Sequence, residues 1–292
     1  MTRYPPSAAV RRRRRRLRSA AMLTALAAVV VGGAVVAVHQ LEDSEVLVRE
    51  RCSATVGSDT FELTPTQAGN AALISGVAVS RGLPARAASI AIATAIQESR
   101  LENIDYGDDA GPDSRGLFQQ RPSQGWGTEE QVMAPLYATG AFYDALVQVP
   151  GYEALPITEA AQTVQRSAYP EAYADHEPEG RAFASALTGN SPAALNCTLR
   201  EPDGSGDVLA VSSALDEVFG PLGGVADGHR LTMQVTGTTG WAAAQWAVAN
   251  ASTHHITSVA YSGLEWVRED DGWTPTTSAD GTLTVTVAAA TP

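Results

Sequence analysis

Small and apolar residues recur at helical spacing through the middle of the chain. Thr64, Pro65 and Gln67 match an N-cap, a proline at the first helical position and a capping-box partner, which predicts a helix over residues 71–81. Residues 85–101 carry small or apolar side chains on nearly every side, as is typical of a buried helix. Shorter helical patterns follow at 129–133, 135–146, 158–166 and 178–187. Alternation typical of strands is scarce here, so this region is predicted to be mostly α-helical.

A different pattern begins after the short polar segment 201–206 (EPDGSG). Helices are expected at 208–219 and at 241–252, the second capped by Thr239, and strands are expected at 230–236, near 256–267 and at 283–287. Strands that alternate with helices favour a small α/β domain.

The N-terminal segment has the charge pattern of a membrane anchor. The first 40 residues hold eight arginines and no acidic residue, and residues 20–38 are uncharged. At 1.5 Å per residue this stretch spans roughly 28 Å, close to the thickness of the hydrocarbon core. The arginines favour a cytoplasmic N-terminus, which places the body outside the cytoplasm at the cell membrane. A cleaved signal peptide, which would release a secreted body, is the alternative, although residues 36–38 form a poor cleavage site.

These patterns divide the chain into six segments and predict the fold class α+β. The expected segments are a cytoplasmic arginine-rich tail (1–18), a transmembrane anchor (19–38), a juxtamembrane segment (39–51), a mostly α-helical domain (52–197), a linker (198–207) and a small α/β domain (208–292).

Charge and cysteine content narrow the function classes. Beyond residue 40 there are 12 basic and 32 acidic side chains, which argues against nucleic acid as a partner. Cys52 and Cys197 belong to no metal-binding or redox motif, and a disulfide between them fits an exported protein, with two unrelated buried thiols as the alternative. Metal-site, nucleotide-binding and dinucleotide-binding motifs are missing from the sequence, so no metal and no cofactor is expected.

Glu98 stands at the end of the apolar segment 88–96, where a carboxylate is costly unless it lies at a cleft edge. Partial burial would raise its pKa and keep it partly protonated, as a general acid for a glycosidic oxygen requires. The alternative is an exposed glutamate that pairs with Arg100.

Glu98 and Ser99 are followed, after a loop rich in Asp and Gly, by residues 116–119 (GLFQ) and by Pro122. This order resembles the lytic transglycosylase and goose-type lysozyme superfamily, whose signature is a Glu-Ser pair followed by a GLMQ-like motif and then a proline. The 18 residues from Glu98 to Gly116 are slightly more than is usual in that family. The resemblance covers 52–197 and implies a lysozyme-like domain that cleaves the β-1,4 bond between N-acetylmuramic acid and N-acetylglucosamine in the glycan strands of peptidoglycan.

The resemblance also implies roles for individual residues. Glu98 corresponds to the catalytic acid/base, and Ser99 to the residue that supports it at the helix end. The family's AYNAG segment is matched only weakly, by residues 164–168 (VQRSA), where Gln165 replaces the asparagine. A tyrosine late in the family's domain hydrogen-bonds the catalytic glutamate, and Tyr173 or Tyr169 would correspond to it. The turn that would line the sugar groove consists of Gly116, Leu117, Phe118 and Gln119.

Two parts of this predicted site stay open. Trp126, between two glycines, offers a flat apolar face to a sugar, with core packing as the alternative. Asp105 and Asp113 are candidates for holding a water molecule, with solvated loop acids as the alternative. Goose-type enzymes activate water and release a reducing end, whereas lytic transglycosylases form a 1,6-anhydro product without a second carboxylate. The sequence is compatible with either product.

A non-catalytic envelope protein is the rival function, in which a lysozyme-like domain only binds glycan strands. Residues 208–292 hold four of the five tryptophans and resemble no family that we recognise. These aromatic residues fit either a surface that recruits an envelope protein partner or a small tryptophan-stabilised core.

Overall fold

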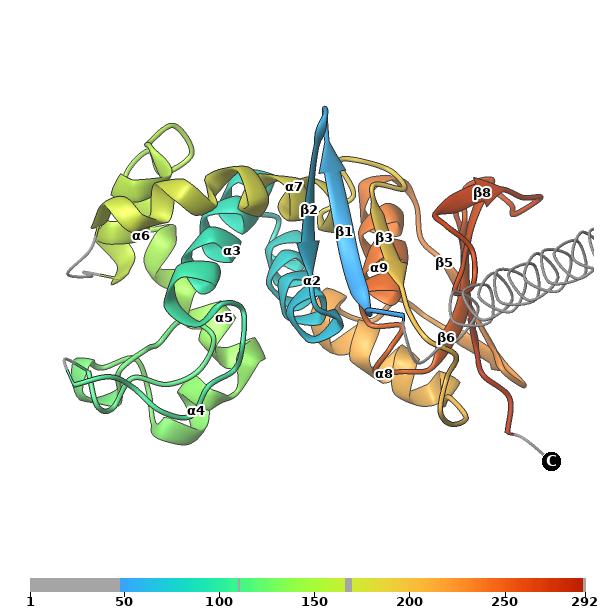
Figure 1. Cartoon of the computed structure of the whole chain (residues 1–292), viewed down its shortest axis with the longest axis horizontal. Coiled ribbons are helices and arrows are strands. Elements are labelled where there is room, and N and C mark those ends of the chain that lie inside the picture. The colour runs from blue at the N-terminus through green and yellow to red at the C-terminus, as the bar shows by residue number, and fades with distance from the viewer. Residues whose placement is uncertain (1–47, 110, 166–169, 291–292) are drawn as a thin grey trace, which may run out of the picture. The chain divides into compact units, whose positions relative to one another are not determined.

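The computed structural model describes residues 48–109, 111–165 and 170–290, and their fold is α+β, as expected. Residues from 49 onward form one compact unit (Figure 1). The expected arginine-rich tail, the membrane anchor and most of the juxtamembrane segment lie outside the described residues. Within the described ranges, none of the helices combines the length and the hydropathy needed to cross a membrane.

Two central helices follow their sequence signals. Helix α2 (Pro65–Ser80) begins at Thr64, whose hydroxyl accepts the N–H of Gln67 while the Gln67 side chain accepts the N–H of Thr64. The capping box is therefore confirmed. Helix α3 (Ala85–Ser99) is buried along nearly its whole length, because alanines between its isoleucines let the neighbouring helices approach closely.

The remaining helices of this region lie around α3 (Figure 1). They are η2 (Pro122–Gln124), α4 (Glu129–Met133), α5 (Pro135–Leu146), α6 (Ile157–Gln165), η3 (Pro170–His176) and α7 (Glu177–Leu187). Helix α3 contacts α5, α6, η3 and α7, so the buried helix is the element against which the others are placed. The four shorter helices predicted at 129–133, 135–146, 158–166 and 178–187 match α4, α5, α6 and α7 to within one residue at each end.

A small antiparallel sheet, absent from the sequence prediction, closes this region. Its strands are β1 (Arg51–Val56), β2 (Asp59–Leu63) and β3 (Leu195–Thr198), in the order β2-β1-β3. Cys52 lies opposite Cys197 in the β1–β3 pair, and the predicted disulfide joins them. The sheet thus links the first and last parts of the helical region.

The C-terminal part contains helices and a six-stranded sheet. Its elements are α8 (Val208–Phe219), β4 (Val225–Asp227), β5 (Arg230–Gln234), α9 (Gly237–Ala249), β6 (Ile256–Tyr261), β7 (Leu264–Val267), β8 (Trp273–Pro275) and β9 (Thr282–Val287). The strand order is β4-β5-β9-β6-β7-β8, and all pairings between these strands are antiparallel.

Two expectations for this part were wrong in detail. The expected α/β arrangement is replaced by an antiparallel sheet, in which tight turns join β4 to β5 and β6 to β7, and β9 lies between β5 and β6. One such turn holds Ser262 and Gly263 at positive φ and divides 256–267 into two strands. Helix α9 begins at Gly237 after the N-cap Thr236, so Thr239 lies inside the helix and does not cap it.

The tryptophans after residue 208 pack inside the molecule. Trp266 is fully buried and donates its Nε1–H to Oδ1 of Asn196 at 2.9 Å. Trp273 donates to the carbonyl of Leu195 at 2.8 Å and packs edge-on against Trp241. The sequence left open whether these tryptophans form a partner surface or a core, and the structure shows core packing. Trp266 and Trp273 also join the large sheet to strand β3.

The apolar core continues across the boundary between the two sequence patterns. Helix α9 contacts both α2 and α7. On α9, the buried Gln245 donates from Nε2 to the carbonyl of Ala186 at 2.6 Å, and its Oε1 accepts the N–H of Leu195 at 2.8 Å. A buried amide whose donor and acceptor are both satisfied fixes the register of the elements that it joins.

We expect replacement of both Cys52 and Cys197 by alanine to lower the free energy of unfolding by about 3–5 kcal/mol, because the disulfide closes a long loop of the unfolded chain. Urea denaturation of both proteins measures the difference. The wild type under a strong reductant serves as control and should show the same loss. An unchanged midpoint in the variant would contradict a stabilising role for the crosslink.

Candidate active site

Glu98 lies on the last turn of α3, where the helix leaves the core. The helix ends at Arg100, which adopts a left-handed conformation with φ 56°. The chain then turns back, and Leu101 is fully buried. Glu98 is therefore half-buried: its backbone belongs to a rigid core helix, and its carboxyl group reaches the surface at the helix end.

Two donors from distant parts of the chain meet the carboxyl group of Glu98. The fully buried Tyr173, on η3, donates its hydroxyl to Oε1 at 2.6 Å. The side chain of Gln165, at the end of α6, also hydrogen-bonds the carboxyl group. Of the two tyrosines that the sequence offered, Tyr173 occupies this position, and Tyr169 lies outside the described residues.

The environment raises the pKa of Glu98. Burial is the largest cause, because desolvation disfavours the charged carboxylate. The negative charge of Asp108 acts in the same direction, whereas the hydrogen bonds from Tyr173 and Gln165 lower the pKa and offset part of the effect. The balance favours a carboxyl group that holds its proton to a higher pH than an exposed glutamate does.

Ser99 connects the end of α3 to the 115–120 turn. Its buried hydroxyl donates to the carbonyl of Leu117 at 2.7 Å. The turn is closed by paired backbone hydrogen bonds between Arg115 and Gln120, each 3.0 Å long. Gly116 has φ 77°, and a Cβ there would lie 2.2 Å from the carbonyl oxygen of Val132, so only glycine fits.

The side chains of the GLFQ turn do not all face a ligand, which corrects the expectation for two of them. Leu117 and Phe118 are fully buried, and Phe118 stacks on Phe142 with ring centroids 4.6 Å apart. Gln119 is half-buried and bends back, donating from Nε2 to the carbonyl of Gly116 at 3.2 Å. The turn contributes backbone to the site: the carbonyl of Phe118 accepts Nε2 of Gln165 at 2.7 Å.

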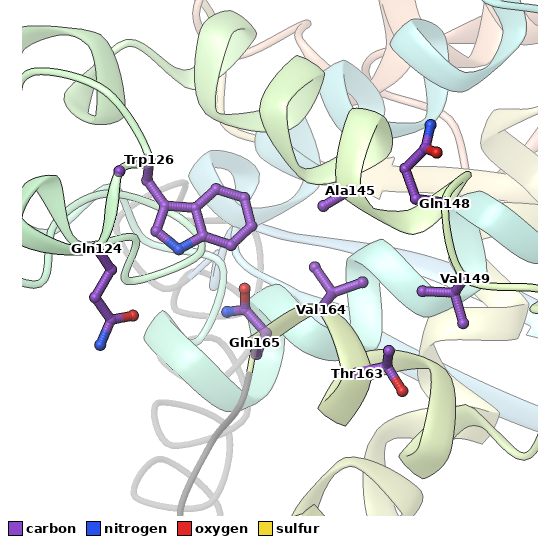
Figure 2. A pocket seen from close by; sticks show the side chains of 9 residues that line it. Gln124, Trp126, Ala145, Gln148, Val149, Thr163, Val164 and Gln165 are labelled. Carbon is purple, nitrogen blue, oxygen red and sulfur yellow. The ribbon is translucent and has the colours of Figure 1, made fainter.

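A groove is lined by Gln165, the residue that hydrogen-bonds Glu98, and by the predicted aromatic face of Trp126. Its volume is about 720 Å³. The half-buried ring of Trp126 and the amide of Gln165 both point into it (Figure 2). The lining residues are uncharged: Gln124, Gly125, Trp126, Ala145, Gln148, Val149, Thr163, Val164 and Gln165. An apolar ring together with neutral amides and a hydroxyl suits an uncharged polar ligand such as a sugar.

The three loop aspartates Asp105, Asp108 and Asp113 have different surroundings. Asp113 accepts the N–H of Ser123 at 3.0 Å and pairs with Arg121 at 2.8 Å, and these contacts hold its pKa well below the usual range. Its Oδ1 pairs with Arg121 and its Oδ2 accepts from Ser123, so both oxygens hold the loop. Asp105 is exposed on the loop. Asp108, which sequence analysis did not single out, is the loop carboxylate whose charge acts on Glu98.

Known proteins supply no family for this chain. Neither a scan against protein-family models nor a search of curated proteins found a match. Over the described residues, His, Cys, Asp and Glu side chains form no group of three that could hold a metal ion. The resemblance to lytic transglycosylases therefore depends on Glu98, Ser99, the 116–119 turn and Tyr173.

Two conservative variants should move the pKa of Glu98 in opposite directions. Asp108→Asn removes a like charge, so the pKa of Glu98 should fall, and the asparagine oxygen can still accept the N–H of Gly111. Tyr173→Phe removes a hydrogen bond that favours the anion, so the pKa should rise. Titration of ¹³C-labelled glutamate carboxyl groups by NMR, with Glu98→Gln for assignment, measures both shifts.

The exposed Asp105 provides the matched control, since Asp105→Asn should leave the titration of Glu98 unchanged. Shifts of the same sign in Asp108→Asn and Tyr173→Phe would contradict the arrangement described above.

Proposed function

We propose that residues 52–197 form a lysozyme-like domain that cleaves the β-1,4 bond between N-acetylmuramic acid and N-acetylglucosamine in peptidoglycan. The observation that carries this proposal is the half-buried carboxyl group of Glu98, which has a raised pKa and accepts hydrogen bonds from Tyr173 and from Gln165, a residue that lines an uncharged groove. A carboxylic acid whose raised pKa keeps its proton to a higher pH is suited to protonate a glycosidic oxygen.

In the proposed reaction the two oxygens of Glu98 have separate tasks. Because Tyr173 donates to Oε1, the acidic proton belongs on Oε2, from which it is transferred to the glycosidic oxygen as the C–O bond breaks. The resulting carboxylate is stabilised by the hydrogen bonds from Tyr173 and Gln165. Glu98 then acts as a base and takes a proton from the hydroxyl group that attacks the anomeric carbon.

The attacking hydroxyl group distinguishes two products. Attack by the substrate's own 6-hydroxyl group gives a 1,6-anhydro product and needs no second carboxylate. Attack by water gives a reducing end and needs a group that orients the water. We take Asp108, whose negative charge acts on Glu98, as a further candidate for that task beside Asp105 and Asp113.

We place this activity in the cell envelope. The arginine-rich segment followed by an uncharged stretch fits a single-pass anchor with a cytoplasmic N-terminus. The disulfide between Cys52 and Cys197 is compatible with an oxidising compartment outside the cytoplasm and supports this location.

Glu98→Gln should lower the rate of glycan cleavage by about 10²- to 10⁴-fold, because glutamine cannot donate the proton. The experiment digests purified peptidoglycan with the full chain, wild type beside variant, and identifies the soluble products by mass spectrometry. Anhydro-muropeptides from the wild type would identify a lytic transglycosylase, and reducing-end muropeptides would identify a hydrolase and favour a loop aspartate as the water-orienting group.

Unchanged turnover in Glu98→Gln would refute the assigned role. If glycan strands bind to the wild type but no muropeptides are released, the alternative of a non-catalytic glycan-binding protein replaces this proposal. A Glu130→Gln variant, changed at an exposed position on α4, is the matched control and should keep wild-type turnover.

A further inference from the structure

A second groove lies against the same end of α3 that carries Glu98. Its volume is about 500 Å³. It is formed by α2, α3, β2, η3 and α7, and its lining residues are Glu62, Leu63, Gln67, Ile96, Gln97, Arg100, His176 and Glu179. Gln97 belongs to this groove and Glu98 is the next residue, so the two side chains leave the helix about 100° apart.

The second groove is charged, whereas the groove beside Trp126 is uncharged. Arg100 is exposed on one wall, and Glu179 is half-buried near the start of α7 on another. Glu62 is paired with Arg51 at 2.9 Å, so its charge is already balanced. Burial raises the pKa of Glu179, which means that its anion lacks part of the solvation it would have in water. A cationic group in the groove would offset this loss.

One short element connects the second groove to the carboxyl group of Glu98. Element η3 provides Tyr173, which hydrogen-bonds Glu98, and His176, whose Nε2 lies 3.0 Å from Oε1 of Gln97. The two contacts fix η3 to neighbouring residues of α3. A ligand in the second groove therefore touches the segment that positions the catalytic tyrosine.

We propose that the second groove binds the peptide branch of the glycan substrate, a short peptide that carries both ammonium and carboxylate groups. This inference rests on the proposed function, since it concerns another part of the same substrate. Glu179 would accept the ammonium group, and Arg100 would pair with a carboxylate. The neutral groove would then hold sugar rings while the charged groove holds the peptide, on two sides of Glu98.

The experiment compares two substrates with the full chain: glycan strands that carry their peptides, and the same strands after an amidase has removed them. Glu179→Gln and Arg100→Gln should each raise KM about tenfold on peptide-bearing strands, with kcat within about twofold, because each loses a charge-assisted contact. On stripped strands both variants should match the wild type. Trp126→Ala, in the neutral groove, should impair both substrates, and Glu130→Gln, outside both grooves, should impair neither.

Equal losses on both substrates, or no loss on peptide-bearing strands, would overturn the inference. Two variants on different elements, α7 and the end of α3, keep the test decisive if one of them fails to fold.

A binding measurement separates failure of this inference from failure of the proposed function. The probe is a free tetrapeptide with a diamino acid at its third position, titrated into wild type and Glu179→Gln by calorimetry. Binding that is about tenfold weaker in the variant supports the groove assignment even if no glycan is cleaved. Equal binding, or none to the wild type, would overturn the groove assignment while leaving the role of Glu98 unaffected.

Discussion

The hydrogen bond from Tyr173 to Glu98 is the interaction on which the site depends. It joins two residues 75 positions apart, and the tyrosine is fully buried while the carboxyl group is half-buried. Burial favours the protonated acid, and the tyrosine stabilises the anion that remains after proton transfer. The two effects on the pKa of this carboxyl group therefore oppose each other, and burial is the larger of the two.

The surrounding structure holds these two groups in place. Helix α3 is a rigid core element, and the hydroxyl of Ser99 fixes the 115–120 turn to its last residue. That turn presents the Phe118 carbonyl to Gln165, which in turn reaches Glu98. Four chain segments, α3, the turn, α6 and η3, thus share one hydrogen-bonded network. The small sheet with its disulfide holds the ends of this region together.

Local signals predicted the main helices well, but they did not predict the sheet β2-β1-β3, whose strands pair across most of the helical region. The capping box at Thr64 and the buried helix around Glu98 follow from residue spacing alone. No local sequence pattern links Tyr173 to Glu98, so only the resemblance to the family predicted their hydrogen bond. Phe118 was expected in the groove, but an apolar ring gains more by stacking on Phe142. Asp108 could not be distinguished from Asp105 or Asp113, since only the folded loop shows which charge acts on Glu98.

In the proposed function, Glu98 meets a glycosidic bond of a glycan strand that lies in the groove lined by Trp126 and Gln165. The most direct test is a crystal structure of Glu98→Gln with a bound β-1,4-linked oligosaccharide of alternating N-acetylglucosamine and N-acetylmuramic acid. We expect a glycosidic oxygen within hydrogen-bond distance of the residue 98 side chain, with a sugar ring against the face of Trp126. An oligosaccharide bound elsewhere, with no ring near residue 98, would contradict the claim.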